Sequence, residues 1–135
     1  MLRTLLLTTT LLTATTHTFA QGDCPVGESE LVISIVPDNW PNEISWTVTH
    51  DSSPIGAGNV AGGSLCVPTG ECLIFTMNDS YGDGLVGQGG YTVTLDGVLV
   101  ASGGTAHGNN YTYTQVTEVN CPPGFSCGNP LPVTE

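Results

Sequence analysis

Two aspartates in a glycine-containing loop are the residues of this chain whose types and spacing suit metal binding. Asp79 and Asp83 lie in the segment Asn-Asp-Ser-Tyr-Gly-Asp-Gly at residues 78–84, directly after the apolar run Leu-Ile-Phe-Thr-Met at residues 73–77. Glycine permits a tight turn, which lets carboxylates and backbone carbonyls converge on one point. A hard cation such as Ca²⁺ prefers such a cluster of oxygen ligands. The loop therefore predicts a calcium site at the end of a strand.

A second acidic segment upstream supplies further candidate ligands. Asp38 and Glu43 lie in the segment Asp-Asn-Trp-Pro-Asn-Glu-Ile-Ser-Trp at residues 38–46. The site is not an EF-hand, because Gly90 stands where an EF-hand loop that starts at Asp79 has its last, bidentate Glu. The alternative interpretation is that Asp and Gly simply form a good turn here.

Two aromatic residues lie in the same two segments. Trp40 precedes Pro41, and Tyr81 lies between the two aspartates of the loop. Aromatic rings beside a Ca²⁺ site can stack on the apolar faces of sugar rings, so both are candidate ligand-binding residues. Core packing, or a lid over the metal, is the alternative for both. Trp46 lies on the apolar face of a strand and is predicted to be in the core.

The two segments together resemble a recurrent secreted β-sandwich module, found in surface proteins of marine bacteria and algae. Its members carry Asp-Asn-aromatic-Pro-x-Glu-Thr-Ser-Trp, then a Cys pair, then Asp-Ser-Tyr-Gly-Asp-Gly. The likeness covers residues 29–120 and departs at Ile44, where the family has Thr, and at Leu85, often Trp or Ile there. The resemblance implies a sandwich fold and an extracellular location more than any activity.

The amino terminus predicts a cleaved secretory signal peptide over residues 1–20. It has a short positive start with Arg3, a stretch rich in Leu and Thr, and small residues before Gln21. The alternative, a membrane anchor, is disfavoured because the stretch is short and rich in Thr. Residues 21–121 are then one β-sandwich module, and residues 122–135 a linker or the start of a following domain.

The charge balance excludes some partners. Arg3 is the only Lys or Arg among the 135 residues, against twelve Asp and Glu, for a formal net charge of −11. Removal of the signal peptide takes Arg3 with it and makes the charge one unit more negative. Such a chain lacks the usual means of binding phosphate backbones, so we expect no nucleic-acid partner. No stretch after residue 20 could span a bilayer, so we expect no membrane insertion. Its carboxylates must be neutralised by cations, backbone amides or water.

Five cysteines behind a signal peptide predict disulfides in an oxidising compartment. Cys66 and Cys72 flank a turn-like connection and are expected to pair. Cys24 precedes the first strand and Cys121 follows the last, so a bridge between them would close the domain, leaving Cys127 free. Pairing of Cys121 with Cys127 is the alternative, and it would leave Cys24 unpaired.

The strand pattern predicts an all-β fold, an antiparallel β-sandwich that is jelly-roll-like with about seven strands. Asp96-Gly97 predicts a type I′ hairpin turn, and Gln115-Val116 a β-bulge. The glycine-rich stretches 52–63, 81–90 and 103–110 are expected to be loops. The expected strands are 31–36, 44–49, 64–67, 72–77, 91–95, 98–102 and 111–119, with 64–67 and 72–77 forming a pair.

The sequence contains no recognisable catalytic motif. It has no zinc-type His or Cys spacing and no Gly-x-Ser-x-Gly nucleophile motif. We therefore expect a secreted, non-catalytic, Ca²⁺-binding module for surface adhesion or assembly, with a surface glycan or protein as partner. A carbohydrate-binding accessory domain of a secreted hydrolase is the main alternative, and a small hydrolase the weaker one.

Overall fold

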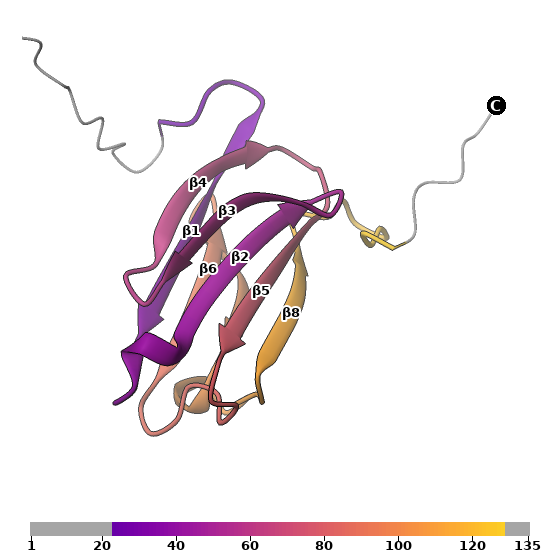
Figure 1. The fold of residues 1–135 in the computed structure, drawn as a ribbon. Coiled ribbons are helices and arrows are strands. Elements are labelled where there is room, and N and C mark those ends of the chain that lie inside the picture. Colours follow the sequence, from indigo (N-terminus) through magenta and orange to yellow (C-terminus); the bar gives the residue numbers. More distant parts are fainter. Residues whose placement is uncertain (1–22, 129–135) are drawn as a thin grey trace, which may run out of the picture.

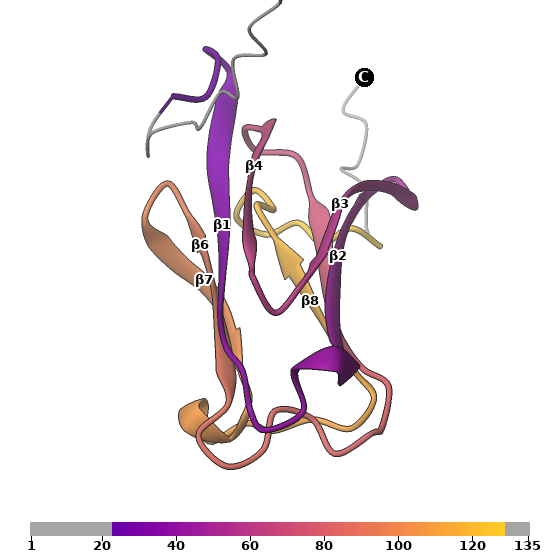
Figure 2. The same cartoon turned by 60° about the vertical axis from the view of Figure 1, so that its left-hand side comes forward.

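The computed structural model describes residues 23–128 as two antiparallel β-sheets packed face to face (Figures 1 and 2). The expected all-β antiparallel sandwich is confirmed, with eight strands. The expected signal peptide lies outside the described residues. No helix within 23–128 is long and apolar enough to cross a membrane. The strands are β1 (Glu28–Val36), β2 (Ile44–His50), β3 (Ser53–Asn59), β4 (Gly63–Pro68), β5 (Leu73–Asp79), β6 (Gly90–Leu95), β7 (Val98–Gly103) and β8 (Thr114–Val119), with the short 3-10 helices η1 (Pro41–Glu43) and η2 (Thr105–His107).

One sheet has the strand order β4-β1-β6-β7 and the other β3-β2-β5-β8. The hairpin between β6 and β7 turns at Asp96 and Gly97, with φ values of 48° and 79°. Positive φ at both central residues is what a type I′ turn requires, so that prediction is confirmed.

Alternation along the strands builds the core between the sheets. In β5 the buried positions are Leu73, Phe75, Met77 and Asp79. Three apolar side chains thus enter the core, and the fourth inward position is a carboxylate at the end of the strand. The Phe75 and Tyr91 rings, from opposite sheets, lie 5.4 Å apart between centroids. Trp46 is 2% exposed, which confirms its assignment to the core.

The prediction of a glycine-rich loop over residues 52–63 is wrong, because strand β3 occupies most of this stretch. These glycines make room for large side chains. A Cβ atom on Gly58 would lie 2.6 Å from the Trp46 ring, and one on Gly56 would lie 2.7 Å from Leu65. Packing of the indole therefore requires glycine in a strand, where glycine is otherwise disfavoured.

Two expectations about strand pairing are wrong. Residues 64–67 do not pair with residues 72–77, because β4 pairs with β1 and β5 pairs with β2 and β8. No bulge occurs at Gln115-Val116, since β8 keeps one register along β5. The register shifts instead lie at Val48/Thr49 in β2 and at Val93/Thr94 in β6.

Both expected disulfides are also wrong. The bridges are Cys24–Cys66 and Cys72–Cys121, while Cys127 is the free thiol, as expected. Neither the Cys66–Cys72 bridge nor the Cys24–Cys121 bridge forms. The two bridges agree with folding in an oxidising compartment.

Strand pairing explains the observed bridges. Cys24 precedes β1, and Cys66 lies on the antiparallel neighbour β4, where Glu28 pairs with Pro68. Cys72 precedes β5 and Cys121 follows its neighbour β8, where Leu73 pairs with Val119. Each bridge thus joins the ends of adjacent strands within one sheet, whereas the chain between Cys66 and Cys72 crosses from one sheet to the other.

Candidate metal centre at one end of the sandwich

The pairing of β2 with β5 brings the two acidic segments together. Ile44 is the register partner of Asp79, so Glu43 lies beside the end of β5. The Ser80 N–H donates a hydrogen bond of 3.0 Å to the Glu43 carbonyl. Figure 2 shows η1 and the β5–β6 loop meeting at the lower end of the sandwich. The segments at residues 38–46 and 78–84 are therefore neighbours in space as well as alike in composition.

Three carboxylates gather at this end. One oxygen each from Glu43, Asp79 and Asp83 lie within 4.8 Å of one another. No Lys or Arg occurs within residues 23–128 to neutralise them. The structure thus unites three of the four expected metal ligands in a group that could hold a cation, here called the acidic cluster.

Asp38 is the fourth expected ligand, and it lies outside the acidic cluster. Its Oδ1 accepts a hydrogen bond of 2.8 Å from the Trp40 N–H, and its Oδ2 accepts one of 3.2 Å from the Val86 N–H. One carboxylate therefore ties the β1–β2 connection to the β5–β6 loop. Asp38 positions the two loops that carry the acidic cluster.

Asp79 is the buried member of the cluster, with 2% of its surface exposed. Its Oδ1 accepts a hydrogen bond of 2.9 Å from the Tyr81 N–H, and its Oδ2 accepts one from the Gly84 N–H. Its own N–H donates to the Tyr113 carbonyl at 2.7 Å. Backbone amides satisfy this carboxylate, as expected for a buried charge without a cationic side chain nearby.

Asp83 contrasts with Asp79. Its Oδ1 is closed off from solvent and has no hydrogen-bond partner among the described residues. Its backbone carbonyl accepts a hydrogen bond of 2.7 Å from the Asn110 side-chain amide. The loop around it needs glycine, because Gly84 has φ of 77° and a Cβ there would collide with the Tyr111 carbonyl. Asp83 is therefore held in place with an unpaired carboxylate oxygen.

The charges of the cluster act on one another. The pKa of the Asp83 carboxyl is raised, first by desolvation and then by the Asp79 charge. The pKa of Glu43 is raised by desolvation and by the charges of Asp79, Asp83 and Asp38. Both shifts mean that the protein disfavours the ionised forms when no cation is present.

The two expected ligand-binding aromatics flank the cluster. Trp40 is 50% exposed and Tyr81 is 71% exposed. Together with Glu43 and Asp83 they line a hollow of about 310 Å³. The interpretation of Trp40 and Tyr81 as core residues is wrong, and both rings are open to a partner.

Two residues of the β7–β8 connection, Asn110 and Tyr113, support the loop, although no sequence pattern predicts them. The Asn110 side-chain amide donates a hydrogen bond to the Asp83 carbonyl, and the Tyr113 carbonyl accepts one from the Asp79 N–H. The Tyr113 ring also packs against Gly82. Their sequence neighbourhood carries no metal-ligand pattern. Only the pairing of β5 with β8 brings them to the site.

Comparisons of the chain with protein-family models, with curated proteins and with solved structures find no match. The likeness to the secreted sandwich modules of marine bacteria and algae remains a prediction.

Proposed function

We propose that this chain is a secreted, non-catalytic module that binds Ca²⁺ at the acidic cluster and serves surface adhesion or assembly. One observation carries the proposal. Glu43, Asp79 and Asp83 converge to within 4.8 Å in a region that has no Lys or Arg to balance them. A divalent cation supplies the missing positive charge.

The chemistry of the cluster favours Ca²⁺. Ca²⁺ accepts about 6–8 oxygen ligands in flexible geometry, so three carboxylates can be completed by carbonyls and water. The unpaired Asp83 Oδ1 is one oxygen that gains a partner on binding. Because Glu43 ends η1 and Asp83 lies beyond β5, the ion would fasten two loops together.

The surroundings of Asp79 support a non-catalytic role. Both of its carboxylate oxygens accept backbone hydrogen bonds, and the side chain is buried. A carboxylate in that state is poorly placed to attack a substrate or to take up its proton. The small-hydrolase alternative would require such a role from one of the three carboxylates.

An extracellular role agrees with the two disulfides and with the acidic surface. A Ca²⁺ ion near the surface can exchange coordinated water for oxygens of a partner. The partner would then be a surface glycan or a protein that presents hydroxyl or carboxylate groups beside the hollow.

The second candidate is a carbohydrate-binding accessory domain of a secreted hydrolase. It is favoured by Trp40 and Tyr81, which line the same hollow as two members of the cluster. Exposed aromatic rings offer stacking surfaces for sugar rings, whose hydroxyls could reach the ion. If this candidate is right, Trp40→Ala and Tyr81→Ala will weaken polysaccharide binding, and a chelator will abolish it.

Thermal melting tests the proposal. A ligand that binds only the folded state stabilises it by about 2.7 kcal/mol at 100 times its dissociation constant. We expect Ca²⁺ to raise the melting temperature, Mg²⁺ to do so less, and Asp83→Asn to reduce the effect. Coincident melting curves in excess Ca²⁺ and in chelator would exclude the site.

A further inference from the structure

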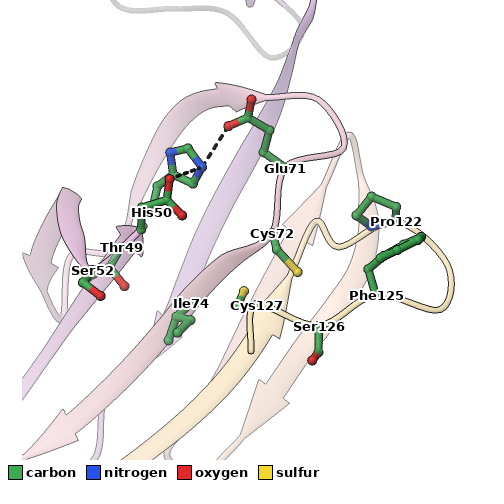
Figure 3. A pocket seen from close by; sticks show the side chains of 11 residues that line it. Thr49, His50, Ser52, Glu71, Cys72, Ile74, Pro122, Phe125, Ser126 and Cys127 are labelled. Atoms are coloured by element: carbon green, nitrogen blue, oxygen red, sulfur yellow. Dashed lines mark ion pairs between the residues drawn. The ribbon is translucent and has the colours of Figure 1, made fainter. Parts of the chain in front are cut away.

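A free thiol lies against a disulfide at the opposite end of the sandwich from the acidic cluster. The Sγ atoms of Cys121 and Cys127 are 3.9 Å apart, and Cys121 is bonded to Cys72. The three sulfur atoms all lie within 4.8 Å of one another. Cys72 and Cys127 both line a pocket at this end of the sandwich, and Figure 3 shows their side chains near one another there. Cys127 is therefore within reach of either sulfur of the bridge.

The fold holds Cys127 in this position. After β8 the chain turns back, with the Phe125 N–H donating a hydrogen bond of 3.0 Å to the Pro122 carbonyl. The Cys127 N–H donates one of 3.0 Å to the Glu118 carboxylate on β8. Two hydrogen bonds from backbone N–H groups, one in the turn and one to β8, thus hold the Cys127 thiol beside the Cys72–Cys121 bridge.

We propose that the three cysteines form a thiol–disulfide exchange site, in which Cys127 displaces Cys72 from its bridge. The Cys127 thiolate attacks the Cys121 sulfur, a Cys121–Cys127 bond forms, and the Cys72–Cys121 bond breaks. Cys72 leaves as a thiolate and takes up the proton that Cys127 lost. One bond is exchanged for another, so the step needs no oxidant or reductant.

The step is local. Because the three sulfur atoms form a triangle, an in-line attack requires rotation of the Cys127 side chain. The strands that carry the bridge stay paired through Leu73 and Val119. Cys72 and Cys127 both line a pocket of about 580 Å³, which leaves room for that rotation. Exchange therefore proceeds in the folded protein.

Charged groups around the pocket control the rate. The pKa of the Cys127 thiol is raised, first by desolvation and then by the Glu118 and Asp51 carboxylates. The pocket is also lined by His50 and Glu71, whose side chains pair at 2.9 Å (Figure 3). Since the thiolate is the nucleophile, exchange is slow at neutral pH. At pH values below the thiol pKa, its rate increases about tenfold for each pH unit.

Exchange moves the free thiol from the tail to the start of β5. The module would then carry one reactive thiol at either of two places, Cys127 or Cys72. A thiol at either place can form a disulfide with a second protein. The Cys24–Cys66 bridge has no third cysteine beside it among residues 23–128 and serves as an internal control.

Pulse alkylation tests the proposal. The oxidised protein is incubated at pH 8.5, quenched in acid, pulsed with N-ethylmaleimide and mapped by mass spectrometry. We expect label on Cys72 together with a Cys121–Cys127 peptide, and a rate that falls about tenfold at pH 7.5. In Cys127→Ser no label should reach Cys72. Label confined to Cys127 after a day at pH 8.5 would overturn the proposal.

A second variant tests the geometry independently of the rate. In Cys72→Ser, Cys121 has lost its partner and should bridge to Cys127, leaving no free thiol after oxidation. The Cys24–Cys66 peptide should be unchanged. Two free thiols, on Cys121 and Cys127, would mean that these residues do not meet and would contradict the exchange step.

Discussion

The Oδ2 atom of Asp79 accepts a hydrogen bond from the backbone N–H of Gly84, five residues further along the chain. The same carboxylate also accepts the N–H of Tyr81. Asp79 therefore closes the β5–β6 loop and at the same time belongs to the acidic cluster. Asp83 belongs to the cluster without closing the loop by its side chain. The two aspartates can thus be distinguished by experiment.

Asp79→Ala should destabilise the protein even in chelator. It leaves the N–H groups of Tyr81 and Gly84 without their acceptor, and a buried unsatisfied group such as the Gly84 N–H costs about 1–3 kcal/mol. Asp83→Ala should cost little or even stabilise under the same conditions, because it removes a repelling charge. Urea denaturation gives both free energies of unfolding. Equal losses for the two variants would contradict the separate roles.

Gly84→Ala should be more destabilising than Gly87→Ala. Both glycines have positive φ, 77° and 64°, so both substitutions incur the cost of about 1–2 kcal/mol for a left-handed residue. Only at Gly84 would the added Cβ collide with the Tyr111 carbonyl, whereas nothing lies within 4 Å at Gly87. The difference between the urea midpoints of the two variants measures the energetic cost of this collision. Identical midpoints would mean that the loop relaxes freely.

Acid should stabilise the cation-free cluster. Glu43 and Asp83 have raised pKa values in the folded protein, above their ordinary values of 4.5 and 3.8. The folded state therefore holds more protons than the unfolded state in the window above those values. The stabilisation from protonated Glu43 and Asp83 is complete below their ordinary pKa values. It is lost as the pH rises through the raised pKa values of the folded state.

The double variant Glu43→Gln, Asp83→Asn isolates this effect. In chelator, the stability of the wild type relative to the variant should increase as the pH falls from 7 toward 4. With Ca²⁺ present the trend should reverse, because protons and the ion compete for the same carboxylates. Melting curves across this pH range are the measurement. A pH-independent difference in chelator would argue against coupling within the cluster.

Each of the two bridges should add to the stability of the folded protein. Removing a native disulfide from a small domain costs about 2–5 kcal/mol, so the free energy of unfolding of the double variant Cys24→Ser, Cys66→Ser should fall by an amount in that range. Cys72→Ser with Cys121→Ser should do so as well. Non-reducing peptide mapping of the wild type identifies the pairing directly. A Cys66–Cys72 peptide would contradict the strand pairing on which the assignment rests.

The sequence was sufficient for the fold class, since alternation and turn residues are local properties. Asp96-Gly97 predicted its hairpin because positive φ at both positions is a property of those residues. Strand β3 could not be predicted, because its glycines make room for side chains of other strands: Gly58 for the Trp46 ring and Gly56 for Leu65. The spacing of the glycines in β3 does not by itself indicate these contacts.

The disulfides and the site depend on which strands pair. Cys66 and Cys72 are close in sequence, but Cys66 lies in β4 of one sheet and Cys72 directly precedes β5 of the other, and no local signal marks the crossing between them. Glu43 could be proposed as a ligand from composition, but its place beside Asp79 follows from the register of β2 on β5. Asp38 could be proposed as a ligand on the same grounds, but its carboxylate accepts hydrogen bonds from two loops and lies outside the acidic cluster.

Calorimetric titration of the protein with Ca²⁺ is the decisive measurement for the proposed calcium site. We expect saturable binding of one Ca²⁺ ion per chain, with Mg²⁺ binding more weakly. Glu43→Gln with Asp83→Asn should abolish the binding, while Glu71→Gln, at the far end of the sandwich, should leave it unchanged. Absence of binding by the wild type, or equal binding by the double variant, would contradict a calcium site at the acidic cluster.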